Sequence, residues 1–162
     1  MTAGRIRTVL GDIEGFDGVA YAHEHLVLDS PLIADRFPHI LLDDVDAAVA
    51  EVAAASVATG APVLTRCEGG RGGIAQVELL VAAGVPAPSI IVSHVDKAQD
   101  LAYLHDLAET GAILELDQSL RELSHGTSSI TVRAVLALVS SGFVNQIVLG
   151  TDGARRSLWN AF

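Results

Sequence analysis

Residues 90–117, "IIVSHVDKAQDLAYLHDLAETGAILELD", place two short apolar runs on either side of a segment with helical periodicity. The runs at 88–96 and 112–118 are continuously apolar before they turn polar, which is typical of strands buried on both faces. The segment between them, residues 98–111, has apolar side chains at helical spacing and ends at a glycine. A strand, a helix and a second strand in this order predict two parallel strands joined by a covering helix.

The same alternation continues on both sides of this unit, which predicts an α/β protein with a parallel sheet and helices outside. A closed (β/α)8 barrel takes about 250 residues, whereas this chain has 162 residues, so it cannot be a complete barrel of this kind. No repeat, linker or low-complexity tract interrupts the pattern, and we expect one domain over residues 1–162. Further strands are expected at 18–25, 61–68 and 145–153, helices at 42–60, 73–84 and 127–142, and a short hairpin at 6–15.

Composition and charge restrict the class of protein. The formal net charge of −10 argues against contacts with the phosphates of nucleic acids. The N-terminal segment lacks the apolar core of a signal peptide, and no apolar run is long enough to cross a membrane. The single cysteine, Cys67, excludes an internal disulfide framework and is expected to be a buried, inert thiol. A soluble cytoplasmic protein that binds neither nucleic acid nor membrane is therefore expected.

Polar side chains follow each of the predicted strands at its carboxyl end. In parallel α/β folds, this edge of the sheet is where ligands bind and chemistry takes place. The pattern therefore predicts a functional site at this edge. The side chains that would lie there include His23, His25, Arg66, Glu68, His94, Asp96, Glu115, Asp117 and Asp152.

His23 and His25, in "AHEHL", lie two residues apart on a predicted strand, so both imidazoles point to the same face. They could share one metal ion, or they could be ordinary histidines at the end of a strand. His94 and Asp152 favour the metal because each lies at the same level of its own predicted strand. Three imidazoles and a carboxylate suit zinc or a similar divalent ion. In such a site the aspartate can also accept a proton from the attacking water.

Three blocks of the sequence together resemble one known family. They are "AHEHL" at 22–26, the stretch at 90–117 and "QIVLGTDGARR" at 146–156, and they occur in the family's order. Over nearly its whole length, the chain resembles the phosphotriesterase-related family of the amidohydrolase superfamily. The resemblance implies a (β/α)8 barrel that holds two divalent metals, usually zinc, at the carboxyl ends of its strands. It also implies metal-dependent hydrolysis of phosphoesters, lactones or related esters.

The resemblance assigns roles to single residues. His23 and His25 match the ligands on the first barrel strand and Asp152 matches the ligand on the last strand, and these bind one metal in the family. His94 matches the sixth-strand ligand of the second metal. Asp152 is the implied catalytic residue, since it would accept the proton of the attacking water. The resemblance thus implies one zinc site made of His23, His25 and Asp152, a second site that includes His94, and a small-molecule ester as substrate.

Three departures from the family pattern reduce the expected metal centre. Between the first two predicted strands the sequence has one helix where the family has three strands, so the lysine that bridges the metals is lost, and Lys97 lies in the wrong element to replace it. Arg66 occupies the place of a histidine ligand, and a guanidinium cannot bind a metal. The chain also stops at Phe162, before the helix that closes the barrel. We therefore expect an internally deleted, C-terminally truncated member that forms a partial (β/α)8 barrel of the TIM type. One zinc site is retained, made of His23, His25 and Asp152, and the second is lost because only His94 remains of it.

Arg66 and Asp96 are the candidate substrate-binding residues. Arg66 could bind an anionic substrate, or it could pair with Glu68 or Asp96, and the pairing is the favoured interpretation. Asp96 could orient His94 or lie near the substrate. Gln118 falls near the place of the family's proton-relay histidine, and an amide cannot relay a proton.

Loss of three strands leaves the remaining strands as one arc, in the order 61–68, 88–96, 112–118, 145–153 and 18–25. Such an arc has two open edges, which predicts self-association. The leading functional interpretation is a metal-dependent hydrolase of ester-type bonds with impaired chemistry. The alternatives are a non-catalytic remnant, a partner subunit of a full-length relative, and a ligand-binding protein that needs no metal.

Overall fold

The computed structural model describes residues 5–8, 11–14, 31–36, 44–122 and 128–152. The chain divides into two compact units, residues 1–43 and 44–162, and each is described by itself. That the whole chain makes a single domain stays a prediction. Within the described ranges, no helix is long and apolar enough to cross a membrane.

The first unit contains a hairpin and a short helix. Strands β1 (Arg5–Thr8) and β2 (Gly11–Glu14) pair antiparallel, as the sequence predicts for the start of the chain. Helix α1 (Pro31–Arg36) is not predicted by the sequence. The strand expected at 18–25, which includes His23 and His25, lies outside the described residues.

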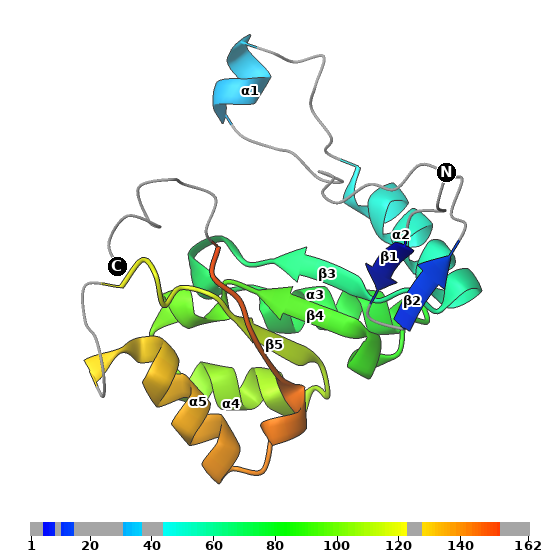
Figure 1. Ribbon diagram of the computed structural model, residues 1–162. Helices are drawn as coiled ribbons and strands as arrows, with labels where there is room; N and C mark the ends of the chain where they lie inside the picture. The colour runs from blue at the N-terminus through cyan, green and yellow to red at the C-terminus, as the bar shows by residue number, and fades with distance from the viewer. Residues whose placement is uncertain (1–4, 9–10, 15–30, 37–43, 123–127, 153–162) are drawn as a thin grey trace. The chain divides into compact units, whose positions relative to one another are not determined.

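A parallel sheet forms the centre of the second unit (Figure 1). Its strands are β3 (Val63–Arg66), β4 (Ile90–Ser93), β5 (Ile113–Leu116) and β6 (Ile147–Leu149). They pair in the order β3-β4-β5-β6, and all three pairs are parallel. The α/β fold class and the predicted order of these four strands are confirmed.

One α-helix connects each pair of neighbouring parallel strands in this sheet, and a further α-helix, α2, precedes β3. The α-helices are α2 (Val45–Thr59), α3 (Gly73–Ala82), α4 (Leu101–Glu109) and α5 (Ile130–Ser140). Short 3-10 helices are η2 (Glu68–Gly70), η3 (Ala87–Ser89), η4 (Val95–Ala98) and η6 (Val144–Gln146). The turns η2 and η4 stand directly after β3 and β4, so the polar residues at these strand ends lie on tight turns.

The start of α5 differs from the sequence prediction. The sequence indicates Thr127 or Ser128 as the cap, but Ser129 takes that position, and its hydroxyl oxygen accepts a hydrogen bond from the Val132 N–H at 3.1 Å. The carboxylate of Glu122 accepts the N–H groups of the first two residues of the helix at 2.8 and 2.9 Å. Because Glu122 supplies this second cap from another segment, hydroxyl residues near the start of a helix cannot alone identify where it begins.

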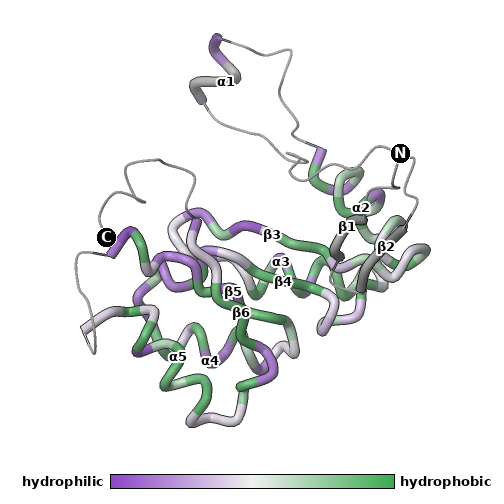
Figure 2. Tube along the Cα trace, viewed as in Figure 1, coloured by the Kyte–Doolittle hydropathy of each residue, from purple (hydrophilic) through white to green (hydrophobic). Residues whose placement is uncertain are grey.

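The hydrophobic core lies between one face of the sheet and the helices. Ile90, Val92 and Leu114 are fully buried and pack with apolar residues of α3, α4 and α5. Alternate strand residues point to the other face, where Leu64 and Val148 are exposed. The sequence predicts burial on both faces, but in the described part of the chain only one face is covered. Figure 2 shows the hydrophobic colour of β3 giving way to hydrophilic colour at its carboxyl end.

Cys67 follows β3 and is fully buried. Burial raises the pKa of its thiol to about 11, so the thiol is protonated at neutral pH. This confirms the prediction of a buried, inert cysteine.

The strands β3 and β6 are the outer strands of the sheet within the described residues. Leu64 on β3 and Leu149 on β6 are both exposed. Outer strands with apolar side chains present backbone groups to which another chain can pair. Self-association through these two edges stays a prediction.

Gly70 allows the turns after β3 and β4 to touch. Its φ is +79°, and an added Cβ would clash with the backbone nitrogen of Ala98 and lie 2.9 Å from the carbonyl carbon of Lys97. Only glycine permits so close an approach at this backbone conformation. The contact between η2 and η4 therefore holds in place the segment that carries several candidate functional residues.

Replacing Gly70 by alanine should destabilise the protein more than the same change at Gly69. Both glycines have positive φ, and a Cβ at Gly69 would meet no atom within 4 Å. Gly69→Ala should cost about 1–2 kcal/mol of backbone strain, and Gly70→Ala should cost about 1–3 kcal/mol more because the neighbouring backbone must move. Urea denaturation of the two variants measures the difference. Equal losses at both positions would contradict the close approach.

Candidate metal centre

The loops that follow β4, β5 and β6 bring polar side chains together at one edge of the sheet. His94 follows β4, Asp117 and Gln118 follow β5, and Asp152 lies beyond β6. The structure thus brings together two of the four predicted metal ligands, His94 and Asp152. The other two ligands, His23 and His25, lie outside the described residues.

Both of these ligands have unusual backbone conformations. His94 has a φ of 63° and Asp152 a φ of 40°, which side chains other than glycine rarely adopt. In the described ranges only Gln99 shares this feature among non-glycine residues. Strained backbone of this kind persists where the surrounding structure fixes it, and it often occurs at functional sites. The backbone strain at these two positions therefore points to a functional site at this edge, whatever the chemistry of their side chains.

Asp117 fixes the ring of His94. Its Oδ2 lies 2.6 Å from His94 Nδ1 and also accepts the backbone N–H of His94 at 3.3 Å. Both side chains are buried, at 10% and 4% exposure. A carboxylate only accepts hydrogen bonds, so the proton lies on Nδ1 and Nε2 is left with a free lone pair. This is the arrangement by which proteins orient a histidine for metal binding.

Asp152 is held by two neighbours. Nη2 of Arg121 lies 2.9 Å from its Oδ2 and donates to its backbone oxygen at 2.6 Å. The Nε2 of Gln118 donates to the same Oδ2 at 3.5 Å and to Asp117 Oδ1 at 2.5 Å. Asp117 and Asp152 are therefore joined through one amide. The carboxylate of Asp152 keeps Oδ1 available for another partner, because the contacts of Arg121 and Gln118 are with Oδ2.

His94 and Asp152 face each other across a short gap. His94 Nε2 and Asp152 Oδ2 are 3.9 Å apart, and both are acceptors when the proton lies on Nδ1. Two hydrogen-bond acceptors cannot bond to each other, so this partly buried pair needs a nearby cation. The cation can be a proton on the imidazole, the guanidinium of Arg121 or a metal ion. A neutral imidazole and a carboxylate are donor types that zinc binds, so these residues fit a divalent ion.

The described residues do not complete a metal site. Among them, no group of three or more histidine, cysteine or acidic side chains could hold a metal ion. A zinc ion is usually held by at least three protein ligands. The predicted ligands His23 and His25 lie outside the described residues, so the complete metal site stays a prediction.

Asp96 has a structural role in the loops around the centre. It is fully buried, and its carboxylate accepts the backbone N–H of Asp117 and Gln118 at 3.4 and 3.1 Å and the Thr131 hydroxyl at 2.7 Å. Burial, the largest influence, raises its pKa although these hydrogen bonds lower it. Asp96 thus orients the segment that carries Asp117, and it acts on His94 only through that residue. Its predicted contact with substrate stays a prediction.

Arg66 pairs with Glu68, as the favoured interpretation predicts. The Nη2 of Arg66 lies 3.3 Å from Oε2 of Glu68, and both side chains are largely exposed. An exposed pair of this kind contributes little to stability. The guanidinium stands one strand away from His94, since Arg66 on β3 is opposite Ser93 on β4. A role for Arg66 in binding substrate stays a prediction.

Sequence reasoning places Asp117 at this edge without a role, and it does not identify Arg121 and Thr131. Asp117 is recognisable only as a polar residue after a strand, because its role depends on the register between β4 and β5. Arg121 and Thr131 reach the centre from a loop and from the start of α5. No spacing in the sequence signals these contacts, since the partners are 31 and 35 residues away.

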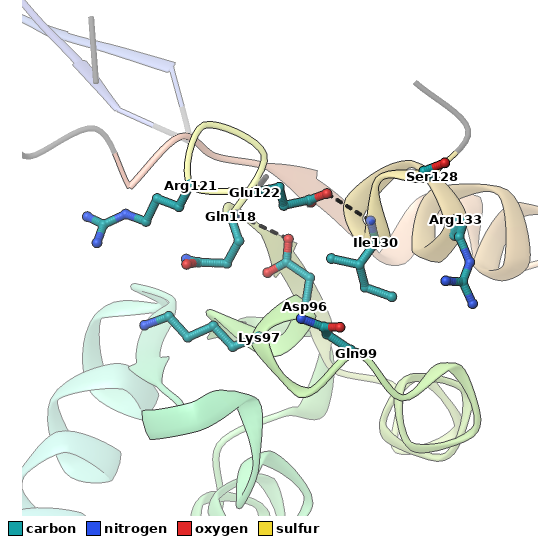
Figure 3. A pocket seen from close by; sticks show the side chains of 9 residues that line it. All are labelled: Asp96, Lys97, Gln99, Gln118, Arg121, Glu122, Ser128, Ile130 and Arg133. Carbon is teal, nitrogen blue, oxygen red and sulfur yellow. Dashed lines mark hydrogen bonds between the residues drawn. The ribbon is translucent and has the colours of Figure 1, made fainter. Parts of the chain in front are cut away.

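A cavity of about 470 Å³ lies beside the centre (Figure 3). Gln118 and Arg121 belong both to the cavity wall and to the surroundings of Asp152. Its size suits a small-molecule ligand. The remaining wall residues are Asp96, Lys97, Gln99, Glu122, Ser128, Ile130 and Arg133.

Glu115 adds a further carboxyl group near the centre. Burial, and then the charges of Asp117 and Asp152, raise its pKa above the ordinary value, while His94 lowers it. Its side chain has no hydrogen-bond partner in the described part of the chain. The raised pKa means that the ionised carboxylate of Glu115 is less favourable in the folded protein than in the unfolded chain.

Replacing Glu115 by glutamine should stabilise the metal-free protein at pH 7. The pKa of Glu115 is raised in the folded protein. The wild type therefore loses stability as the pH rises from about 4.5, the ordinary pKa of a glutamate, through the raised pKa of the folded state. The glutamine variant does not titrate, so its advantage should appear over this range and vanish below pH 4.5. Thermal unfolding in the presence of chelator, from pH 4 to pH 8, measures the difference. The exposed Glu109→Gln serves as a control, and a gain independent of pH would contradict the interpretation.

Comparison with known proteins places the fold and the centre in context. The model of the Phosphotriesterase family matches residues 39–162. The lactonase Lmo2620 from Listeria monocytogenes is 31% identical with a TM-score of 0.62, and the match covers 68% of this chain and 33% of that one. A mutant of the PTE-like lactonase from Deinococcus radiodurans is 25% identical with a TM-score of 0.59, and the match covers 66% of this chain and 34% of that one.

The organophosphorus hydrolase from Deinococcus radiodurans shares the fold, with a TM-score of 0.59 at 24% identity, over 66% of this chain and 33% of that one. The chain thus spans about a third of the length of these structures. The family model covers more than half of the chain and includes His94, Asp117 and Asp152. It includes two of the three motifs that carry the resemblance, those at 90–117 and 146–156, whereas the motif at 22–26 lies outside the matched residues. The chain belongs to the phosphotriesterase family.

Proposed function

We propose that this chain is a cytoplasmic, metal-dependent hydrolase of ester-type bonds, either lactones or phosphoesters. The observation that carries the proposal is the pair of acceptors, His94 Nε2 and Asp152 Oδ2, that face each other at 3.9 Å. Membership of the phosphotriesterase family supports a hydrolase. The similar structures are named as lactonases and as an organophosphorus hydrolase, which supports an ester as substrate.

One zinc ion would be held by His23, His25 and Asp152, the ligands of the site that the sequence retains. His94, which the resemblance assigns to the lost second site, would join them, because its Nε2 lies 3.9 Å from Asp152 Oδ2. Imidazole nitrogen and carboxylate oxygen are donors that zinc prefers, although another divalent metal would find the same donors. We expect no second ion, because Arg66 stands where the resemblance places a histidine and its guanidinium repels a cation.

Each residue around the centre would have its own role in the reaction. A bound divalent ion supplies polarisation of the ester and activation of water. Asp152 accepts the proton of the attacking water, while Arg121 and Gln118 hold its carboxylate in place. Asp117 keeps the His94 ring in the tautomer that leaves Nε2 free. Gln118 cannot relay a proton, so the proton passes from Asp152 to solvent.

A non-catalytic chain is the alternative, either a remnant or a partner subunit of a full-length relative. The ion pair between Arg121 and Asp152 favours it, because the pair neutralises the carboxylate without any metal. Metal binding separates the two interpretations, since a remnant has no reason to keep a saturable zinc site.

Zinc binding is the first test. Calorimetric titration of the metal-free protein should reveal one saturable site. His94→Ala and Asp152→Ala should each weaken it by at least about tenfold, the effect of losing about 1.4 kcal/mol. His105→Ala is the matched control, because His105 is an exposed histidine on α4. The zinc-loaded protein is then assayed with a γ-lactone and with a p-nitrophenyl phosphotriester. A wild type without a saturable site, or a zinc-loaded one without turnover of either ester, would refute the proposal.

Asp117 should act as a positioning residue for His94. Asp117→Asn removes the charge that holds the Nδ1 proton, and loss of such a partner lowers metal affinity about 10- to 100-fold. Asp106→Asn is the control, because Asp106 stands near an exposed histidine at 4.0 Å. Nitrogen chemical shifts of the His94 ring report its tautomer, which a purely structural role of Asp117 would leave unchanged. Unchanged zinc affinity together with an unchanged tautomer would contradict this role.

A further inference from the structure

An apolar groove of about 340 Å³ lies between α5 and the end of β6. Its wall includes Val132, Val135 and Leu136 of α5 and Leu149 of β6. Leu136 is 58% exposed and Leu149 is 66% exposed within the described part of the chain. Figure 2 shows β6 and most of α5 in the hydrophobic colour. Single exposed apolar side chains are ordinary, but several that line one groove indicate a surface that another segment or molecule covers.

The groove suits an apolar occupant. Among the described residues, its wall contains no charged side chain. The hydroxyl of Thr131 belongs to the wall, but it is already engaged by the carboxylates of Asp96 and Glu122. Ser119 adds one further hydroxyl. A charged or strongly polar ligand would lose its hydration here and gain few partners, whereas apolar side chains would leave water favourably.

Residues 153–162 follow the described part of the chain at a point beside this groove. Gly150 belongs to the wall, and Asp152 is the last described residue. The part of α5 that the wall uses most, residues 132–136, is about 6 Å long at about 1.5 Å per residue. Seven extended residues, 153–159, can span about 23 Å. This segment is therefore long enough to reach every part of the groove.

The composition of this segment matches the groove. The chain has one tryptophan and four phenylalanines, and the segment contains Trp159 and Phe162, with Leu158 beside the tryptophan. One aromatic side chain can bury about 150–250 Å² of surface. Arg155 and Arg156 lie nearer to the described part of the chain. They can remain in water while the apolar side chains that follow them are buried.

We propose that residues 153–162 fold back on this groove and cover it with Leu158, Trp159 and Phe162. The groove and this segment belong to the same compact unit, whereas residues 1–43 form another. The segment is thus a better candidate than the N-terminal part of the chain. It is also present in every copy of the protein, so the groove is filled without a partner.

Docking of the segment would fix the backbone around Asp152 from its far side. Before Asp152, the N–H of Gly150 already donates to the Leu116 carbonyl at 3.0 Å. Asp152 itself has a φ of 40°, which persists only where the surrounding structure maintains it. A docked segment after Asp152 would supply the second constraint. The proposal concerns the packing of the chain alone, so it does not rest on the proposed function.

The fluorescence of Trp159 tests the proposal directly, because it is the only tryptophan of the chain. The full chain is measured in the presence of chelator, by emission wavelength and by acrylamide quenching. In the wild type, we expect emission at shorter wavelength and slower quenching than in the urea-unfolded chain. Leu136→Gln and Leu149→Gln should each raise the quenching rate at least about twofold and shift the emission to longer wavelength, because a polar amide replaces apolar contact.

Three further variants serve as controls. Leu79→Gln is the matched change, because Leu79 is an exposed leucine of α3 outside the wall, and it should leave both readouts unchanged. Leu136→Met keeps an apolar side chain of similar volume and should also leave them unchanged. Phe162→Ser alters the occupant and not the wall, so it should expose Trp159 even if a wall variant fails to fold. Urea unfolding of each variant reveals any loss of global stability.

The outcomes separate this segment from other occupants. Exposure of Trp159 in the wall variants but not in Leu79→Gln, unchanged on dilution, supports the proposal. A wild-type Trp159 as exposed as in the unfolded chain overturns it. A buried Trp159 that responds neither to the wall variants nor to Phe162→Ser also overturns it, because the tryptophan then packs elsewhere. Fluorescence that changes on dilution, together with the mass measured by light scattering, overturns it in favour of a second copy in the groove.

Discussion

A hydrogen bond of 2.6 Å between His94 Nδ1 and Asp117 Oδ2 joins the ends of β4 and β5. Asp96 makes the reverse connection, since its carboxylate accepts the N–H groups of Asp117 and Gln118. Each of the two loops thus supplies an acceptor for the other. These bonds form only if both strands end at the same level, which the parallel register of Ile91 with Ile113 ensures. The geometry of the candidate metal centre follows from this reciprocal connection.

The same connection reaches the third strand of the centre. The N–H of Gly150 donates to the Leu116 carbonyl at 3.0 Å, so the pairing of β6 with β5 continues up to the residue before Thr151. Asp152 follows with positive φ and meets the amide of Gln118. A backbone held this closely explains how two non-glycine residues keep unfavourable conformations, because the hydrogen bonds around them offset the strain. The hydrogen bonds of the sheet therefore fix the positions of the candidate ligands at this edge.

The sequence predicts most of the fold because the alternation of apolar runs and helical periods is strong between residues 61 and 149. It predicts His94 and Asp152 at one edge because carboxyl ends of parallel strands meet there. It does not predict that Asp117 orients His94, since that depends on register, nor that Arg121 reaches Asp152, since that depends on the path of a loop. Local patterns encode periodicity, whereas contacts between distant side chains follow only from the folded backbone.

Arg121 fixes the position of Asp152 without a metal. Its guanidinium contacts Oδ2 and the backbone oxygen of Asp152, so it holds the carboxylate even when no ion is near. A divalent ion bound as we propose would be repelled by this fixed positive charge, which would lower the affinity of the site for a metal.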